Sequence, residues 1–107
     1  FTLMFKESTM REVIDELFHE AGFMPDILFE SSSNHTLHTM VKNNLCCTIL
    51  PEIYAVEDDK VAYFRLPSRP VWEICAVYKK GSYLTKAGKD FINMASLFWN
   101  SPEGSHC

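Results

Sequence analysis

The 107-residue sequence predicts an α/β fold built on a mainly parallel sheet of five strands flanked by helices. Through the first 50 residues, short apolar runs alternate with amphipathic helical patterns in the order strand, helix, strand, helix, strand. This alternation is typical of parallel strands joined by crossover helices. The third run, 45–50, is almost continuously apolar, as expected for a strand covered by helices on both faces. Two further strand-like runs, 61–66 and 71–78, complete the five.

The first strand and helix are expected within the first 22 residues. Residues 1–5 form a short apolar run bounded by polar residues, which predicts a buried strand. Ser8 or Thr9 is expected to cap the helix that follows, with Glu12 completing a capping box after Thr9. Gly22 is expected to end this helix. Apolar residues recur along it at helical spacing, giving one face made of Val13, Ile14, Leu17, Phe18 and Ala21.

The second strand is expected at 26–30, and the polar residues 31–34 offer caps for a second helix. That helix carries an apolar stripe of Leu37, Met40 and Val41.

Beyond the third strand, the pattern becomes less regular. A short irregular helix is expected over 52–56, and a last helix from Thr85 to about Trp99. The apolar face of the last helix consists of Ala87, Phe91, Met94, Ala95 and Phe98. Residues 101–107 are expected to form a disordered tail.

Charge and cysteine content limit the classes of function. The net charge of -4 and the pI near 5.5 give no electrostatic footprint for phosphates, so direct nucleic-acid binding by this segment is not expected. No apolar run is long enough to cross a bilayer. The chain starts without Met in structured sequence, which suggests a piece of a longer polypeptide. Cys46 and Cys47 are adjacent and Cys75 lies in an apolar run, a distribution that favours reduced thiols in a cytoplasmic protein.

Four local phrases resemble the second half of the effector-binding domain of LysR-type transcriptional regulators. They occur at 1–11, at 18–25 (with its AGF-x-P phrase), at 41–52 and at 78–85, in the order and spacing of that family. The resemblance runs from Phe1 to about Trp99.

This resemblance implies a subdomain of the type 2 periplasmic-binding-protein fold, with an effector held between two subdomains. Residues 1–78 would form the second subdomain. Residues 79–100 would form the hinge return and a C-terminal helix that packs on the first subdomain. The implied protein is no enzyme and uses no cofactor. It pairs as a homodimer or homotetramer, has no membrane partner, and binds DNA only through an N-terminal winged helix-turn-helix.

The expected effector is a small polar or anionic metabolite. Ligands of parallel α/β sheets bind beyond the carboxyl ends of the strands, where helix N-termini present free N–H groups. Two such places exist, before the first and the second helix, and a further polar segment follows the second helix. The simpler interpretation, that the residues before the helices only cap them, is compatible with this role. The candidate effector-binding residues are Ser8, Thr9, Ser33, Asn34, Thr36, Thr39, Asn43 and Asn44.

The sequence departs from the family pattern at residues 43–46. The family commonly has Gly-x-Gly there, whereas this chain has Asn43-Asn44-Leu45-Cys46. Asn tolerates the left-handed backbone region, so Asn43 or Asn44 could replace a glycine at the end of the second helix. Cys46 would add a side chain near the effector cleft.

Three alternatives fit parts of the sequence. A solute-binding lobe of a transport protein shares the implied fold. A thiol-based redox sensor would use Cys46 and Cys47, although no basic residue adjacent in sequence would lower their pKa. His35 and His38 could share a metal on one helix, but no third ligand is evident, so no metal site is expected.

Overall fold

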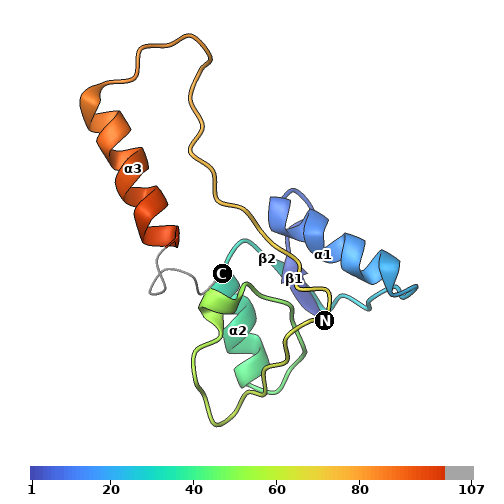
Figure 1. Cartoon of the computed structure of the whole chain (residues 1–107). Coiled ribbons are helices and arrows are strands. Elements are labelled where there is room, and N and C mark those ends of the chain that lie inside the picture. Colours follow the sequence, from blue (N-terminus) through green and yellow to red (C-terminus); the bar gives the residue numbers. More distant parts are fainter. Residues whose placement is uncertain (101–107) are drawn as a thin grey trace. The chain divides into compact units, whose positions relative to one another are not determined.

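The computed structural model describes residues 1–100 (Figure 1). Along the chain the elements are β1 (Thr2–Met4), α1 (Thr9–Glu20), β2 (Phe29–Ser31), α2 (Asn34–Lys42), the short 3₁₀ helix η1 (Glu52–Tyr54) and α3 (Lys86–Asn100). The chain divides into two units: residues 1–72 contain the sheet, α1, α2 and η1, and α3 belongs to the unit that begins at Glu73. No described helix has the length and apolar character needed to cross a membrane.

The sheet consists of β1 and β2, which pair in parallel. Backbone hydrogen bonds continue the ladder at both ends. The Leu28 N–H donates to the Phe1 carbonyl (2.8 Å), and the Phe5 N–H donates to the Ser31 carbonyl (3.1 Å). Because parallel neighbours need a crossover, α1 lies between them in sequence, as the alternating pattern predicts.

Helices α1 and α2 cover opposite faces of this sheet (Figure 1). Side chains alternate between the two faces along a strand, and β1 shows this at consecutive residues. Leu3 is fully buried in a cluster with Met10, Ile14 and Phe18 of α1. The hydroxyl of Thr2, on the other face, lies 3.8 Å from the sulfur of Met40 in α2. The predicted α/β arrangement of helices over both faces is therefore present in this unit.

Both helices of the first unit end as their sequences predict. After α1, Gly22 has φ 66°, and the Phe23 N–H donates back to the Phe18 carbonyl (3.1 Å). After α2, Asn44 has φ 61°, and the Leu45 N–H donates back to the Met40 carbonyl (3.2 Å). These are Schellman motifs, which place one left-handed residue after the helix. Of the two asparagines considered for this position, Asn44 adopts the glycine-like conformation.

The prediction of a five-stranded sheet is wrong for the described residues, where the sheet has two strands. Residues 45–50 do lie beside β1: the Thr2 N–H donates to the Cys47 carbonyl (2.9 Å), and Ile49 packs against the core. The next bond, however, comes from the hydroxyl of Thr48 to the Thr2 carbonyl (2.6 Å). A side chain thus takes the place of a backbone donor, and a strand ladder needs successive backbone bonds.

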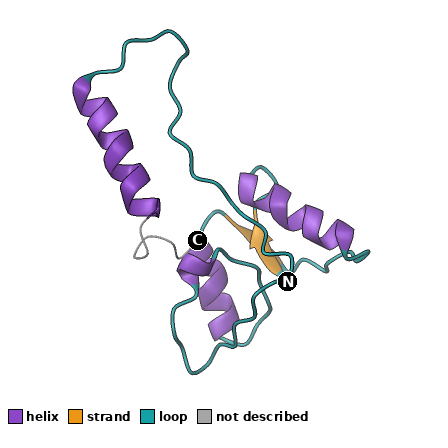
Figure 2. Ribbon diagram, viewed as in Figure 1, coloured by secondary structure: helices purple, strands orange, loops and turns teal. Residues whose placement is uncertain are grey.

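The other two predicted strands, 61–66 and 71–78, run as loops (Figure 2). Their apolar side chains are largely exposed: Phe64 is 88% and Val77 is 89% exposed. An apolar run becomes a strand only when a neighbouring edge supplies hydrogen-bonding partners. Within residues 1–100, neither run pairs with such an edge.

The predicted last helix is confirmed as α3, and the short irregular helix as η1. Thr85, just before α3, caps this helix, because its hydroxyl accepts the Gly88 N–H (3.1 Å). Most large apolar side chains of α3 are exposed, including Phe91 and Met94 at 69% each. The tail expected at 101–107 lies outside the described residues.

Candidate functional site

The first turn of α1 follows the carboxyl end of β1. Ser8 is its N-cap: the Ser8 carbonyl accepts the N–H groups of Arg11 (3.0 Å) and Glu12 (3.3 Å), while the Ser8 side chain makes no capping bond. Thr9 is the first helical residue, and its hydroxyl accepts the indole N–H of Trp72 (3.2 Å). The predicted capping box is therefore wrong. With Ser8 as N-cap, Glu12 is one residue too far along to bond back to it.

The first turn of α2 follows the carboxyl end of β2. Ser33 is its N-cap, and its hydroxyl accepts the Thr36 N–H (3.3 Å), as the polar cluster predicts. The Ser33 N–H donates to the hydroxyl of Ser31 (3.1 Å), the last residue of β2. The side-chain oxygen of Asn34 is buried and has no hydrogen-bond partner among the described residues. One acceptor of this turn is thus left without a partner.

The two turns lie at the same edge of the sheet. The Phe5 N–H, just after β1, donates to the carbonyl of Ser31, the last residue of β2 (3.1 Å). Ser8 lies three residues after Phe5, and its N–H donates to the Phe5 carbonyl (3.0 Å). The structure therefore brings the candidate residues of the two turns to one sheet edge: Ser8, Thr9, Ser33, Asn34 and Thr36.

The remaining candidates lie away from that edge. Thr39 is in the second half of α2 and donates to the His35 carbonyl (2.9 Å), and the Asn43 side chain donates to the Thr39 carbonyl (2.7 Å). A helix rises 1.5 Å per residue, which separates Asn43 from Asn34 by about 13 Å along α2. Thr39, Asn43 and the neighbouring Asn44 therefore do not join the two turns.

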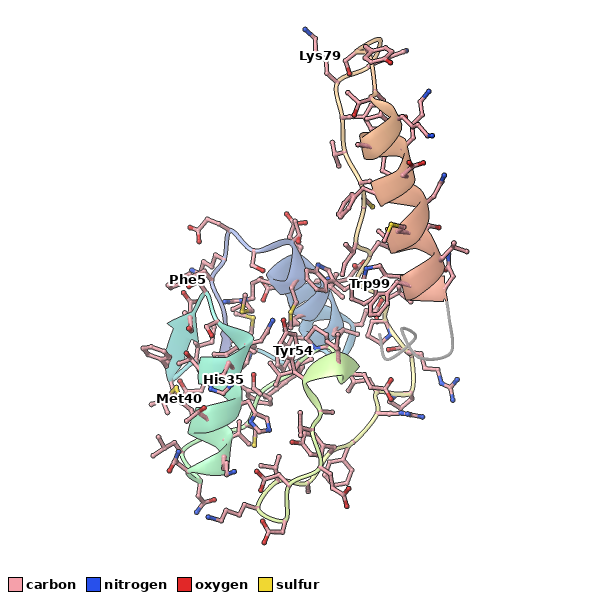
Figure 3. The ribbon with its side chains drawn as sticks, turned by 90° about the vertical axis from the view of Figure 1, so that its left-hand side faces the viewer. Phe5, His35, Met40, Tyr54, Lys79 and Trp99 are labelled. Carbon is pink, nitrogen blue, oxygen red and sulfur yellow. The ribbon has the colours of Figure 1, made fainter. Side chains whose placement is uncertain are left out.

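A groove of about 380 Å³ runs between one side of α2 and the segment that contains η1. Figure 3 labels His35 on α2 and Tyr54 on η1, the two elements that border it. Among the candidate residues, this groove contains only Thr39. Its lining consists of His35, His38, Thr39, Lys42, Ile53, Tyr54, Val56 and Asp58.

Polar groups of the groove bond to one another. The Lys42 ammonium lies 2.6 Å from the Asp58 carboxylate. The hydrogen bond from Lys42 lowers the pKa of Asp58, and the same bond raises the pKa of Lys42. The Tyr63 hydroxyl donates to the Val56 carbonyl (2.7 Å), so the His38 Nε2–H donates to Tyr63 (2.7 Å). These contacts hold residues 56–63 against α2. The polar groups of Lys42, His38 and Asp58 are therefore already bonded within the protein.

Arg11 is the functional candidate that the sequence patterns did not reveal. Its side chain is only 4% exposed, and it donates to the Asp15 carboxylate (2.7 Å), the Glu30 carboxylate (2.8 Å) and the Met4 carbonyl (2.9 Å). Burial lowers the pKa of Arg11, but the hydrogen bonds to Glu30 and Asp15 outweigh it and hold the pKa above its ordinary value. A signal was present, since Arg11 lies three residues before Ile14 and therefore on its apolar helix face.

The cysteines of the described chain are free thiols. Cys46 is half-buried, and this burial raises its pKa, whereas Cys47 and Cys75 are exposed. Within residues 1–100, no group of three or more His, Cys, Asp or Glu side chains is arranged to hold a metal ion.

Comparisons with known proteins agree with the resemblance. The family model "LysR substrate binding domain" matches residues 1–97. The HTH-type transcriptional regulator YybE of Bacillus subtilis (strain 168) is 27% identical over 92 residues, which cover 85% of this chain and 32% of that protein. The HTH-type regulator YcgK of the same organism is 26% identical over 96 residues, covering 89% of this chain and 30% of that protein. The chain thus spans about a third of the length of these relatives. No solved structure matches the chain significantly.

These matches decide between the alternatives at the level of family. The LysR substrate-binding domain has the type 2 periplasmic-binding-protein fold, which agrees with the α/β order of the first unit. LysR regulators are not enzymes, so the expectation of a non-catalytic domain is confirmed. Because the family model matches 97 of the 107 residues, the chain belongs to the LysR family of transcriptional regulators, as its substrate-binding domain.

Proposed function

We propose that this domain binds a small polar or anionic metabolite at the first turns of α1 and α2. The observation that carries the proposal is the meeting of these turns at the carboxyl ends of β1 and β2, tied by the hydrogen bond from Phe5 to Ser31. In open parallel sheets, ligands bind beyond the carboxyl ends of the strands. The polar side chains that the proposal uses at this edge are those of Ser8, Thr9, Ser33 and Asn34.

The unpaired backbone donors at the start of α2 favour an anionic group on the ligand. The backbone N–H groups of Asn34 and His35 make no hydrogen bond within the described residues. A helix N-terminus also carries partial positive charge, which attracts a carboxylate or similar anion. The buried side-chain oxygen of Asn34 would accept a bond from a donor on the same ligand. A compact metabolite with an acidic group and a hydroxyl or amine satisfies both requirements.

The proposal extends to the full-length regulator in the cytoplasm. Residues 1–78 would form the second effector-binding subdomain and 79–100 the hinge return, with α3 packing its exposed apolar face on the first subdomain. The effector would change the angle between the two subdomains and thereby the geometry of a dimer or tetramer. Helix α1 and strand β2 would contribute to the contacts between subunits. DNA would be bound by an N-terminal winged helix-turn-helix, since the net negative charge of this segment does not favour binding to a nucleic-acid backbone.

The test is a titration of small carboxylates, each paired with its neutral amide, followed by amide chemical shifts in NMR spectra of the 107-residue chain. We expect the carboxylates to shift the signals of Thr9 and residues 33–36 more than the amides do. For the best ligand, Thr9→Val and Asn34→Ala should clearly weaken affinity while lowering the melting temperature only slightly. Thr85→Val is the matched control, because the Thr85 hydroxyl also lies at the start of a helix but in the other unit. Unchanged affinity in both site variants would refute the assignment.

The thiol-based alternative stays a hypothesis with its own test. Cys46 and Cys47 are adjacent free thiols, but burial raises the pKa of Cys46 and so reduces its reactive thiolate. Counting free thiols before and after mild peroxide treatment distinguishes the two functions. An unchanged count would dismiss redox sensing. The transport-type alternative shares the fold, but the family match favours the regulator.

A further inference from the structure

We propose that Arg11 is a positioning residue that couples the first turns of α1 and α2, so that the two halves of the proposed effector site move together. The role of this coupling in effector binding rests on the function proposed above. The mechanical coupling between the two turns does not depend on that function.

The first link runs from Arg11 to the α1 turn. Arg11 is the third residue of α1, and its backbone N–H donates to the Ser8 carbonyl (3.0 Å). The Nη1 atom of the same residue donates to the carbonyl of Met4, the last residue of β1 (2.9 Å). Arg11 therefore holds both ends of the turn that joins β1 to α1. A shift of its side chain would move the N-cap Ser8 relative to the strand.

The second link runs from Arg11 to the α2 turn. Nη1 also donates to the carboxylate of Glu30 in β2 (2.8 Å). The next residue, Ser31, accepts the Ser33 N–H on its hydroxyl (3.1 Å), and Ser33 caps α2 by accepting the Thr36 N–H (3.3 Å). Hydrogen bonds, together with the peptide bond between Glu30 and Ser31, therefore connect Arg11 to the start of α2.

The two carboxylates that face Arg11 are not equivalent. Asp15 lies one turn further along α1 and is 54% exposed, so solvent screens its attraction for Arg11, and it ties α1 only to itself. Glu30 is 28% exposed and belongs to another element. The guanidinium is planar and its donors are fixed in direction, so it holds Met4 and Glu30 at a set angle. A lysine ammonium has no such fixed geometry.

Hydrogen exchange of backbone amides in the 107-residue chain tests the coupling without any ligand. Glu30→Gln and Asp15→Asn are a matched pair, because each removes one negative charge that faces Arg11 and leaves Arg11 in place. Weakening the charge-assisted bond in Glu30→Gln should speed exchange at Thr36 and Leu37 of α2 by about fivefold relative to Ile14. Asp15→Asn should leave the exchange of the α2 amides unchanged.

Two results would overturn the proposal. One is unchanged exchange at Thr36 and Leu37 in Glu30→Gln, and the other is equal acceleration there in Asp15→Asn. Arg11→Lys adds a further check, since it keeps the charge but loses the planar geometry. It should speed exchange at the α2 amides as Glu30→Gln does. Exchange as slow as in the wild type would show that only the charge of Arg11 matters, and would overturn its role in positioning. Because no ligand is present, failure of the effector titration would leave this result intact, and the reverse also holds.

Discussion

At the scale of single residues, the ion pair between Lys42 and Asp58 links stability to pH. The pKa of Asp58 is lowered in the folded protein by the hydrogen bond from Lys42. The contribution of Asp58 to stability is therefore fully present above its unfolded pKa of about 3.9 and is lost as the pH falls through the lower, folded value. The pKa of Lys42 is raised, so its contribution is lost only at alkaline pH.

We predict that Asp58→Asn lowers the melting temperature at pH 7, and that this effect shrinks as the pH falls through the lowered pKa of folded Asp58 and the carboxyl becomes protonated in both states. Thermal unfolding followed by circular dichroism at several pH values measures this difference. Asp59→Asn is the control, because it removes the neighbouring charge and keeps the bond between Lys42 and Asp58. A difference between Asp58→Asn and wild type that does not shrink as the pH is lowered would contradict the prediction.

The cysteines give a second prediction at this scale. Only the thiolate reacts with iodoacetamide, and burial raises the pKa of Cys46. Because reactivity follows thiolate fraction and access, the exposed Cys47 and Cys75 should be alkylated several times faster than Cys46 at about pH 8. Mass spectrometry of the modified peptides measures each rate, with Cys47→Ser used to resolve the adjacent pair. Fastest reaction at Cys46 would instead favour the redox hypothesis.

At the scale of elements, the two helix starts differ in how they are capped. The Ser33 hydroxyl accepts a backbone N–H of α2, whereas the Ser8 side chain makes no such bond to α1. We predict that Ser33→Ala lowers the free energy of unfolding by about 1 kcal/mol and Ser8→Ala by at most a few tenths of that. Urea unfolding of the two variants compares them directly. Equal losses would show that capping by side chains does not distinguish these helices.

The helices could be predicted from the sequence because their signals are local. Gly22 and Asn44 each supply the left-handed residue that ends a helix, and both lie next to the helix that they end. The strands could be predicted less well, since a strand depends on a distant edge. The run 45–50 has the right composition but gains only one backbone bond to β1, while 61–66 and 71–78 gain no strand pairing among the described residues.

The candidate site follows the same division. Ser33 could be identified as a cap because its partner, Thr36, is three residues away. The contact between Trp72 and Thr9 joins residues 63 positions apart, and that between Arg11 and Glu30 joins residues 19 apart. No local pattern specifies such pairs. The sequence therefore indicated the two polar turns but not the residues that hold them together.

At the scale of the whole molecule, the core of buried apolar side chains belongs to the first unit. Leu37 of α2 is one of these buried residues, and Leu3, Met10, Ile14 and Phe18 form a cluster against which Trp72 packs from the end of that unit. All of these residues lie within residues 1–72. A shortened chain that keeps Trp72 should therefore be more stable in its sheet and two helices than one that ends before it.

We predict that a chain of residues 1–72 unfolds in urea with nearly the same free energy as the first unit of the full chain. A chain of residues 1–66 lacks Trp72, with its apolar contacts and its bond to Thr9, and should lose about 2 kcal/mol. Circular dichroism at increasing urea concentrations measures both. Equal stability of the two shortened chains would mean that Trp72 does not support the core.

Trp72 also gives this domain an optical reporter. The chain contains two tryptophans, and the indole N–H of this one donates to the hydroxyl of Thr9, the first residue of α1. Indole emission responds to polarity and hydrogen bonding around the ring. Replacing Trp99 with Phe would leave Trp72 as the single tryptophan, with its indole nitrogen 3.2 Å from the Thr9 hydroxyl. Occupancy of that turn could then be followed by intrinsic fluorescence in a cuvette, with no dye and no labelled ligand.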